Sequence, residues 1–303
     1  MANGSRTSIW GIAEATYGTT PATPSMSRLR FTGADLGIDK DTLSSKEIRS
    51  DRQVTDFRMG QNKAGGSLSA EIMDDTFLDS IIEAVMCGTW TADVLKNGTT
   101  RRSFSFLEYF EDLGAGNTPY HLHKGVEFGS MEVKLQPNGL ATIDFDTISQ
   151  SVTVGAAAPT DAVLGTASTS TAMDSFTGVI TEGGSGVAVV TELSFKVDNE
   201  IDRKFVIGSR DTLRPSMGSS VVTGSITAYF DDKTLLNKFL DETVSSLAVS
   251  VTDGTNTRGF EFPKIRYTGG RPTVKDDGPL TVTLPWQAVY DSVLGASMKI
   301  TRS

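Results

Sequence analysis

The sequence predicts a mainly β protein, an α+β fold built from two copies of one unit with one helix in each. Residues 66–83 align without a gap on residues 224–241. Both segments read as an alternating strand, an acidic break and an amphipathic helix. Self-similarity at a long offset indicates a duplicated folding unit. The identical pairs are Gly66/Gly224, Ser67/Ser225, Ala70/Ala228, Asp74/Asp232, Thr76/Thr234 and Leu78/Leu236.

Length and composition fit a soluble protein with two units of ordinary size. The 303 residues are 38% hydrophobic and 21% charged. Neither a run of about 20 apolar residues nor a signal-peptide pattern occurs. We therefore expect no membrane contact, and a chain that is made and matured in the cytoplasm or leaves it by some other route. The net charge of −9 argues against tight binding of nucleic acid. It leaves open a surface past which DNA slides.

The first part of the chain predicts an arm and then the first unit. Residues 1–27 carry Pro21 and Pro24, which favour an extended arm. The unit over residues 28–155 begins with a short strand. Its stretch 39–65 is too polar for a core and too long for a connector, which is typical of a binding loop or of disorder. The expected elements are strands at 29–31, 67–72, 102–110, 126–135 and 140–145 and a helix at 75–86.

The second unit is expected to repeat this plan. Residues 156–186 are rich in Ala, Thr, Ser and Gly and predict a linker before the unit at 187–303. A downstream similarity relates residues 102–106 to residues 258–262. Asp253-Gly254 predicts a hairpin turn. The expected elements are strands at 187–197, 204–207, 223–230, 247–251, 258–267 and 280–284 and a helix at 233–242.

Motifs of enzyme chemistry are absent in any convincing form, so we expect no enzyme, no metal and no cofactor. His121 and His123 could hold a metal if a carboxylate joined them, but such pairs are more often surface or loop residues. The acidic pairs Asp74-Asp75 and Asp231-Asp232 precede the two predicted helices, where N-capping explains them better than catalysis. Cys87 is expected to be a small buried residue.

Several segments, taken in order, resemble the major tail tube protein family of long-tailed, non-contractile bacteriophages. Each segment is weak alone, and their order and spacing carry the resemblance over nearly the whole chain. They are Tyr17-Gly-Thr-Thr-Pro21, Glu47-Ile-Arg-Ser-Asp-Arg52, Ser103-Phe-Ser-Phe106 through Glu108-Tyr-Phe-Glu-Asp112, Leu193-Ser-Phe-Lys-Val-Asp-Asn199, Tyr229-Phe-Asp-Asp232 and Pro285-Trp-Gln-Ala288.

The resemblance implies a tail-tube-type β-sandwich or barrel unit whose strands join those of neighbouring copies. Rings would stack into a hollow tube that conducts double-stranded DNA into the host without binding it tightly. The implied partners are further copies of the chain and the tape-measure, tail-terminator and tail-tip proteins. The implied location is the tail of the virion, with assembly in the host cytoplasm. Relatives with a single unit form rings of six, so the duplication favours a ring of three. The alternative is a ring of six chains in which only one unit of each chain contributes to the barrel and the other lies outside it.

Two sets of residues are the candidates for these contacts. The polar stretch and the arm suit contacts between subunits, and outward-facing strand positions suit the wall of the tube. The expected contact residues are Lys46, Glu47, Arg49, Asp51, Arg52, Asp56, Arg58 and Tyr17. The expected lumen residues are Glu132, Lys134, Asp144 and Asp146.

Two other classes of function remain open from the sequence. Another structural phage component, such as a decoration or adhesin-like protein, would stay monomeric or form small closed oligomers. A glycan hydrolase would need two carboxylates that converge in a deep pocket.

Overall fold

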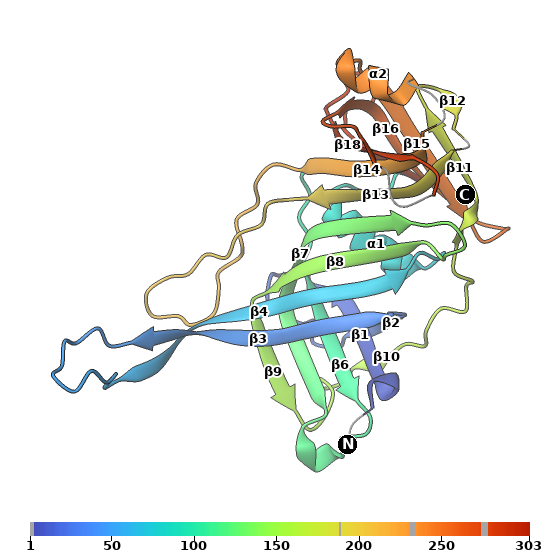
Figure 1. The fold of residues 1–303 in the computed structure, drawn as a ribbon. Coiled ribbons are helices and arrows are strands. Elements are labelled where there is room, and N and C mark those ends of the chain that lie inside the picture. Colours follow the sequence, from blue (N-terminus) through green and yellow to red (C-terminus); the bar gives the residue numbers. More distant parts are fainter. Residues whose placement is uncertain (1–2, 188, 231–233, 274–277) are drawn as a thin grey trace.

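The computed structural model describes residues 3–187, 189–230, 234–273 and 278–303. Strands dominate it and two α-helices pack against them, which confirms the mainly β fold (Figure 1). The elements of the first half are β1 (Thr7–Ala13), β2 (Ser25–Leu29), β3 (Gly33–Ser44), β4 (Phe57–Glu71), α1 (Thr76–Val85), β5 (Val94–Lys96), β6 (Phe104–Phe110), β7 (Tyr120–Leu135), β8 (Thr142–Ser149) and β9 (Ser151–Gly155). The elements of the second half are β10 (Val163–Leu164), β11 (Asp174–Glu182), β12 (Ser185–Gly186), β13 (Val190–Asp198), β14 (Val221–Tyr229), α2 (Thr234–Leu240), β15 (Ser245–Thr252), β16 (Thr257–Tyr267), β17 (Arg271–Thr273), β18 (Thr281–Ala288) and β19 (Lys299–Arg302).

One antiparallel row of strands crosses both halves of the molecule. Its order is β3-β4-β8-β7-β13-β14-β18-β17. The two halves meet inside this row, where β13 pairs with the last part of β7. In Figure 1 these strands lie side by side from β14 down to β3, and α1 lies behind β7 and β8. Among the remaining strands, β6 and β9 pair with the first part of β7.

The pairing order of the strands is the same in the two halves. It is β2-β1-β6-β7-β8-β4-β3 in the first half. It is β12-β11-β15-β16-β18-β14-β13 in the second half. The helices also correspond, because α1 follows β4 and α2 follows β14. All of these strand pairs are antiparallel.

Irregularities in the ladders also occur at matching places. The β6–β7 ladder shifts register between Phe104 and Phe106, and the β15–β16 ladder shifts between Ser245 and Leu247. The β7–β8 ladder shifts register just after Phe128. In the second half, the register of the chain against β18 changes just after Tyr267, between β16 and β17. Together β16 and β17 therefore occupy the place of the single long strand β7.

The downstream similarity predicted between residues 102–106 and 258–262 does not relate equivalent strands. The first segment enters β6, whereas the second lies in β16, whose counterpart is β7. The physical reason is that alternating Phe residues suit any strand with one face on the core. Phe104, Phe106, Phe260 and Phe262 are all buried in this way.

Helix α1 lies between the halves, and one continuous core surrounds it. Its N-cap is Asp75, whose carboxylate accepts hydrogen bonds from the backbone N–H of Phe77 at 2.7 Å and of Leu78 at 3.1 Å, which confirms the predicted cap. Apolar residues on nearly every side of α1 are buried. By contrast, α2 leaves Leu240 64% exposed. The predicted caps Asp231 and Asp232 and the predicted first helical residue Lys233 fall outside the described residues.

Three segments differ from the sequence prediction. Residues 7–13 of the expected arm form β1, which pairs with β6 along its length and buries Ile9 fully. Residues 174–182 of the expected linker form β11, which pairs with β15. The first prediction followed the prolines of the arm and the second followed the Ala, Thr, Ser and Gly content of the linker. Hydrogen bonds to distant strands override both local preferences. The strand expected at 204–207 is instead part of a loop that carries a single bridge between Asp202 and Ser216.

Candidate assembly surfaces

The antiparallel row has one apolar face and one polar face. On β7, Met131 and Val133 point into the core, and Glu132 and Lys134 point the other way, as the alternation of a strand requires. The polar face continues across the junction between the halves, because Lys196 on β13 pairs with Glu132. A shallow depression on this face is lined by side chains of four neighbouring strands, including Glu132, Ser194, Lys196, Thr223, Ser225 and Gln287.

Charges on the polar face are paired but acidic on balance. Lys134 lies 2.9 Å from Asp144 and 3.2 Å from Glu132. Lys196 lies 3.4 Å from Asp198 and 3.9 Å from Asp146. Burial opposes ionisation of Asp144, but hydrogen bonds from Ser69 and Lys134 outweigh it and lower the pKa of this carboxyl. The same face carries the further acids Asp35 and Glu71.

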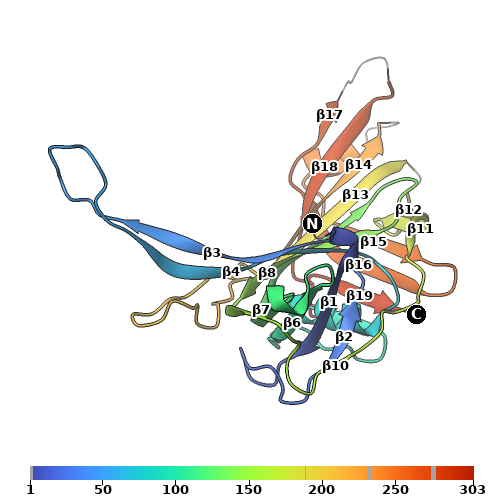
Figure 2. The same ribbon diagram turned by 90° about the horizontal axis from the view of Figure 1, so that it is seen from below.

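The polar stretch at 39–65 is the outer part of a long β-hairpin rather than an irregular loop. β3 and β4 pair out to Ser44 and Phe57, well beyond the point where β4 leaves β8 (Figures 1 and 2). The composition misled the prediction because both faces of this hairpin are in solvent. Its charges pair with one another, for example Lys63 with Asp41 at 2.7 Å. The projecting hairpin, residues 38–63, reaches roughly 40 Å from β8 if the strand rise of about 3.3 Å continues to the tip.

Apolar side chains are exposed along the projecting hairpin. Ile48 at the tip is 99% exposed and Val54 is 68% exposed, and Leu43, Phe57 and Met59 are also exposed. The predicted contact residues Arg49 and Arg58 lie in the same region and form short-range ion pairs, with Asp51 and Asp56 respectively. A projecting element with exposed apolar side chains is typical of a contact surface.

The equivalent connection in the second half, residues 199–220, folds back over the first half. Arg214 Nε lies 2.7 Å from the buried carboxylate of Glu127, and Arg101 pairs with the same carboxylate. Arg203 donates to the carbonyl of Ala64 at 2.8 Å. Tyr17, expected to contact a neighbouring subunit, packs under Arg214 of its own chain, 5.5 Å from ring centroid to guanidinium carbon, and remains partly exposed. Burial here raises the pKa of the Tyr17 hydroxyl.

Comparison with protein families identifies the family of the chain. Residues 4–288 match the family model described as "Phage tail tube protein". The chain belongs to the phage tail tube protein family. No curated protein matches the sequence. Membership of the tail tube family makes the chain a structural component of the bacteriophage tail, which assembles with itself and with other tail proteins.

In this tail tube protein the four predicted lumen residues share one surface. The structure brings Glu132, Lys134, Asp144 and Asp146 together on β7 and β8, on the polar face of the row. The prediction missed Lys196 and Asp198 on β13, which complete the same charge cluster. The alternation of residues 193–198 contained this signal, but only the pairing of β13 with β7 places it beside Glu132.

The other candidate sites have structural explanations in the tail tube protein. His123 lies in β7 rather than in a loop, is fully buried, and its Nε2 lies 2.9 Å from Glu108 Oε2. His121 packs edge-on against Phe110, and burial lowers its pKa. In the described part of the chain, no group of three His, Cys, Asp or Glu residues is placed to hold a metal. No helix in the same part is long and apolar enough to cross a membrane.

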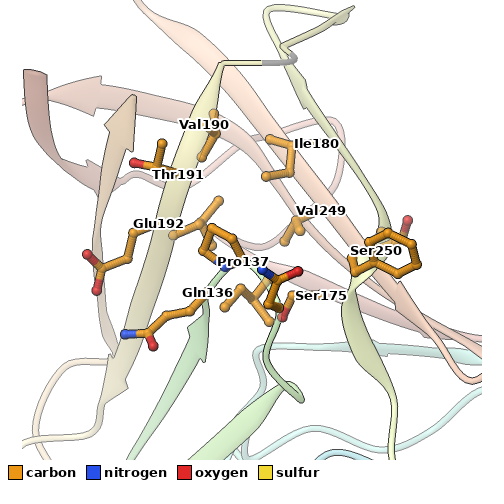
Figure 3. A pocket seen from close by; sticks show the side chains of 14 residues that line it. Gln136, Pro137, Ser175, Ile180, Val190, Thr191, Glu192, Val249 and Ser250 are labelled. Atoms are coloured by element: carbon orange, nitrogen blue, oxygen red, sulfur yellow. The ribbon is translucent and has the colours of Figure 1, made fainter. Parts of the chain in front are cut away.

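A cavity of about 240 Å³ lies where the end of β7 meets the second half (Figure 3). Leu135 and Pro137 line it from one side and Ile180, Val190 and Val249 from the other. Glu192 is the one carboxylate in its lining, and in Figure 3 its carboxylate points away from Ile180 and Val249. This cavity does not offer the pair of facing carboxylates that glycan hydrolysis needs.

Proposed function

We propose that this tail tube protein is not an enzyme and polymerises as stacked rings into a hollow tube through which double-stranded DNA passes. The observation that carries the proposal is the continuous row of strands with one polar face, which crosses both halves of the chain. Its two outermost strands, β3 and β17, each pair on one side only within the described residues. Open sheet edges are sites where another strand can add.

We propose that the two halves are copies of one unit and that three chains close each ring. The matching strand order and the matching register shifts support the duplication. The row contains eight strands, so three chains supply 24. With a strand spacing of about 4.8 Å and a tilt of about 40°, the backbone of such a barrel has a diameter of about 48 Å. Six chains would double this width, beyond what passage of one duplex requires.

The polar face is proposed to line the lumen. Glu132, Lys134, Asp144 and Asp146 would lie there with Lys196 and Asp198. An acidic wall repels phosphates at long range and offers DNA no tight contacts, so the duplex can move. Lys134 and Lys196 are already neutralised by neighbouring acids. Their attraction for a passing phosphate is therefore weak.

The projecting hairpin is proposed to contact the next ring. Lys46, Glu47, Arg49, Asp51, Arg52, Asp56 and Arg58 lie on it together with exposed Ile48 and Val54. A hairpin that leaves its own sheet can bury such residues only against another chain. The tape-measure, tail-terminator and tail-tip proteins are the proposed partners at the inside and the two ends of the tube, with assembly in the host cytoplasm.

Electron microscopy of the concentrated pure protein tests the proposal. We expect tubes, with threefold symmetry that looks nearly sixfold at low resolution. Small closed oligomers without tubes would contradict the tube function and favour a decoration protein. Tubes with six full chains in each ring, by symmetry or by mass per length, would refute the ring of three and leave the tube function standing.

A further inference from the structure

The junction between the two halves is an internal strand pairing whose register is fixed. β13 pairs with β7 so that Lys196 faces Glu132 and Ser194 faces Lys134. Asn199 extends the same ladder by donating its backbone N–H to the carbonyl of Gly129 at 2.8 Å. Asn199 and Gly129 therefore form a hydrogen-bonded pair, and the two kinds of pair alternate along an antiparallel ladder. Glu132–Lys196 lies three positions away, so it is a non-hydrogen-bonded pair, the type in which side chains lie closest.

Each strand of this junction has a counterpart at an open edge of the same chain. β3 corresponds to β13, because Leu36 faces Gly66 as Phe195 faces Gly224, and the two glycines are equivalent in the repeat. Therefore Gly37 corresponds to Lys196. β17 corresponds to the last part of β7. Arg271 faces Thr283 on β18 at the position where Glu132 faces Asp144 on β8.

The side chains of β13 are more buried than those of β3, because β13 has a neighbouring strand on both sides and β3, in the part of the chain that the structure describes, on one side only. Phe195 and Val197 on β13 are 1% and 0% exposed. Their counterparts on β3 are also apolar, but Leu36 is only partly buried and Ile38 is 40% exposed. The same contrast separates buried α1 from partly exposed α2. The first half covers β13, but among the described residues no neighbour covers its counterpart β3. The second half helps to cover α1, but its counterpart α2 stays partly exposed.

We propose that β17 of one chain pairs with β3 of the next chain, antiparallel and in the register of the β7–β13 junction. This rests on the proposed ring, and its occupant is a second copy of the same chain. The register places Arg271 opposite Gly37, with Asp35 and Asp39 as its diagonal neighbours on the same face. An opposite-charge pair thus takes the place of Glu132 and Lys196. Such a contact is head-to-tail, and it forms a ring when the rotation between neighbouring chains closes, as the proposed ring of three requires.

Pro272 explains why this edge does not pair indiscriminately. It occupies the position of Val133, whose N–H points to β13 according to the alternation from Gly129. Proline has no N–H, so the new ladder lacks one donor. Prolines on edge strands restrict pairing with wrong partners. Matching charges and apolar side chains of β3 are then needed to hold the contact.

Disulfide trapping tests the register. We expect Gly37→Cys with Arg271→Cys to oxidise in assembled protein to a covalent trimer and no larger species on a non-reducing gel. Gly37 accepts a side chain because no atom lies within 4 Å of its added Cβ. Non-hydrogen-bonded antiparallel pairs have a suitable separation for a disulfide. The natural Cys87 is buried and does not compete.

Two matched controls calibrate the experiment. Glu132→Cys with Lys196→Cys should form an intrachain disulfide and run as a monomer. Gly33→Cys with Arg271→Cys lies on the same face of β3 but four residues out of register, and should not cross-link. Normal tubes in which only the first control oxidises would overturn the proposed register but not the tube function. A wild-type protein that forms no tubes would instead contradict the proposed function.

Exchanging the charges at Arg271 and Asp39 tests the β17–β3 contact if the cysteine pair prevents assembly. We expect Arg271→Glu to raise the protein concentration needed for assembly about fivefold, because it places a like charge diagonally beside Asp35 and Asp39. Adding Asp39→Arg should restore assembly toward the wild-type concentration. An Arg271→Glu variant that assembles like wild type, or a double variant that shows no recovery, would overturn the proposed contact.

Discussion

The carboxylate of Asp79 on α1 lies 2.5 Å from a guanidinium nitrogen of Arg258 on β16, and Arg258 is fully buried. Arg302 on β19 lies 2.5 Å from the other carboxylate oxygen and stacks over Trp90 at 4.4 Å. One acid from the first half therefore pairs with two arginines from the second, and Asp93 supplies Arg302 with a second carboxylate at 3.3 Å. This cluster links the two halves in addition to the β7–β13 and β5–β19 ladders.

Asp79→Asn should destabilise the chain strongly. The change leaves the buried Arg258 without a carboxylate, and breaking a buried ion pair typically costs about 3 kcal/mol or more. Urea unfolding followed by tryptophan fluorescence measures the loss. Asp112→Asn is the matched control, because Asp112 pairs at 3.1 Å with the exposed Arg6, and such pairs contribute about 1 kcal/mol or less. Equal losses in the two variants would show that the Asp79 cluster does not hold the halves together.

Deletion of residues 46–58 should leave a folded subunit that no longer forms tubes. The deletion joins Ser45 to Met59 and keeps Thr42 opposite Met59 in the β3–β4 ladder. It removes the exposed Ile48 and Val54 but no residue of the core. Circular dichroism checks the fold and electron microscopy checks assembly. Tubes of normal length from this variant would remove the projecting hairpin from the stacking contact.

Asp144→Lys combined with Asp146→Lys should convert tubes that pass DNA into tubes that retain it. Both residues lie on the polar face, so the change adds positive charge to the proposed lumen. Retention of duplex DNA should rise roughly tenfold at low salt and fall steeply as salt is added, because phosphate contacts release counterions. Co-sedimentation of labelled DNA with tubes measures this. Asp241→Lys with Glu242→Lys, after α2 and away from the polar face, should bind less DNA; equal binding would exclude the proposed lumen face.

The Cys87 thiol should react slowly in the folded protein. Cys87 follows α1, is 4% exposed, and burial raises the pKa of its thiol, so little thiolate is present near neutral pH. Iodoacetamide labelling followed by mass spectrometry should show a small fraction of the rate found in concentrated urea. Fast labelling without urea would mean that the loop over residues 199–220, whose Met217 sulfur lies 3.6 Å from the Cys87 sulfur, opens readily.

Asp253 should make the β15–β16 turn sensitive to acid. Hydrogen bonds from the backbone of Asn256 and Thr255, and from the Asn256 side chain, lower the pKa of this carboxyl. A lowered pKa in the folded state stabilises it above the unfolded value of about 3.9. This contribution is lost as the pH falls through the folded pKa. The difference in unfolding free energy between wild type and Asp253→Asn should therefore shrink from pH 6 to pH 3, and a constant difference would contradict it.

Local patterns in the sequence were sufficient for the repeated strand and helix. Strand alternation and helical spacing are properties of neighbouring residues, so the β4–α1 and β14–α2 segments were predictable. The cap at Asp75 was predictable for the same reason, because a carboxylate before a helix satisfies its first N–H groups. The alternation of residues 131–135 likewise placed Glu132 and Lys134 on the face away from the core.

Only the tertiary structure decided which strands pair across the chain. β1 and β11 lack a strong local signal, and they exist because β6 and β15 offer hydrogen-bond partners far away in the sequence. The contact of β13 with β7 is also a pairing between strands far apart in the sequence, and it brings Lys196 beside Glu132. The sequence by itself determined the β4–α1 and β14–α2 segments and the strand alternation that produces the polar face. Tertiary structure decided how the halves join, because an edge-to-edge ladder depends on backbone groups that every residue except proline carries.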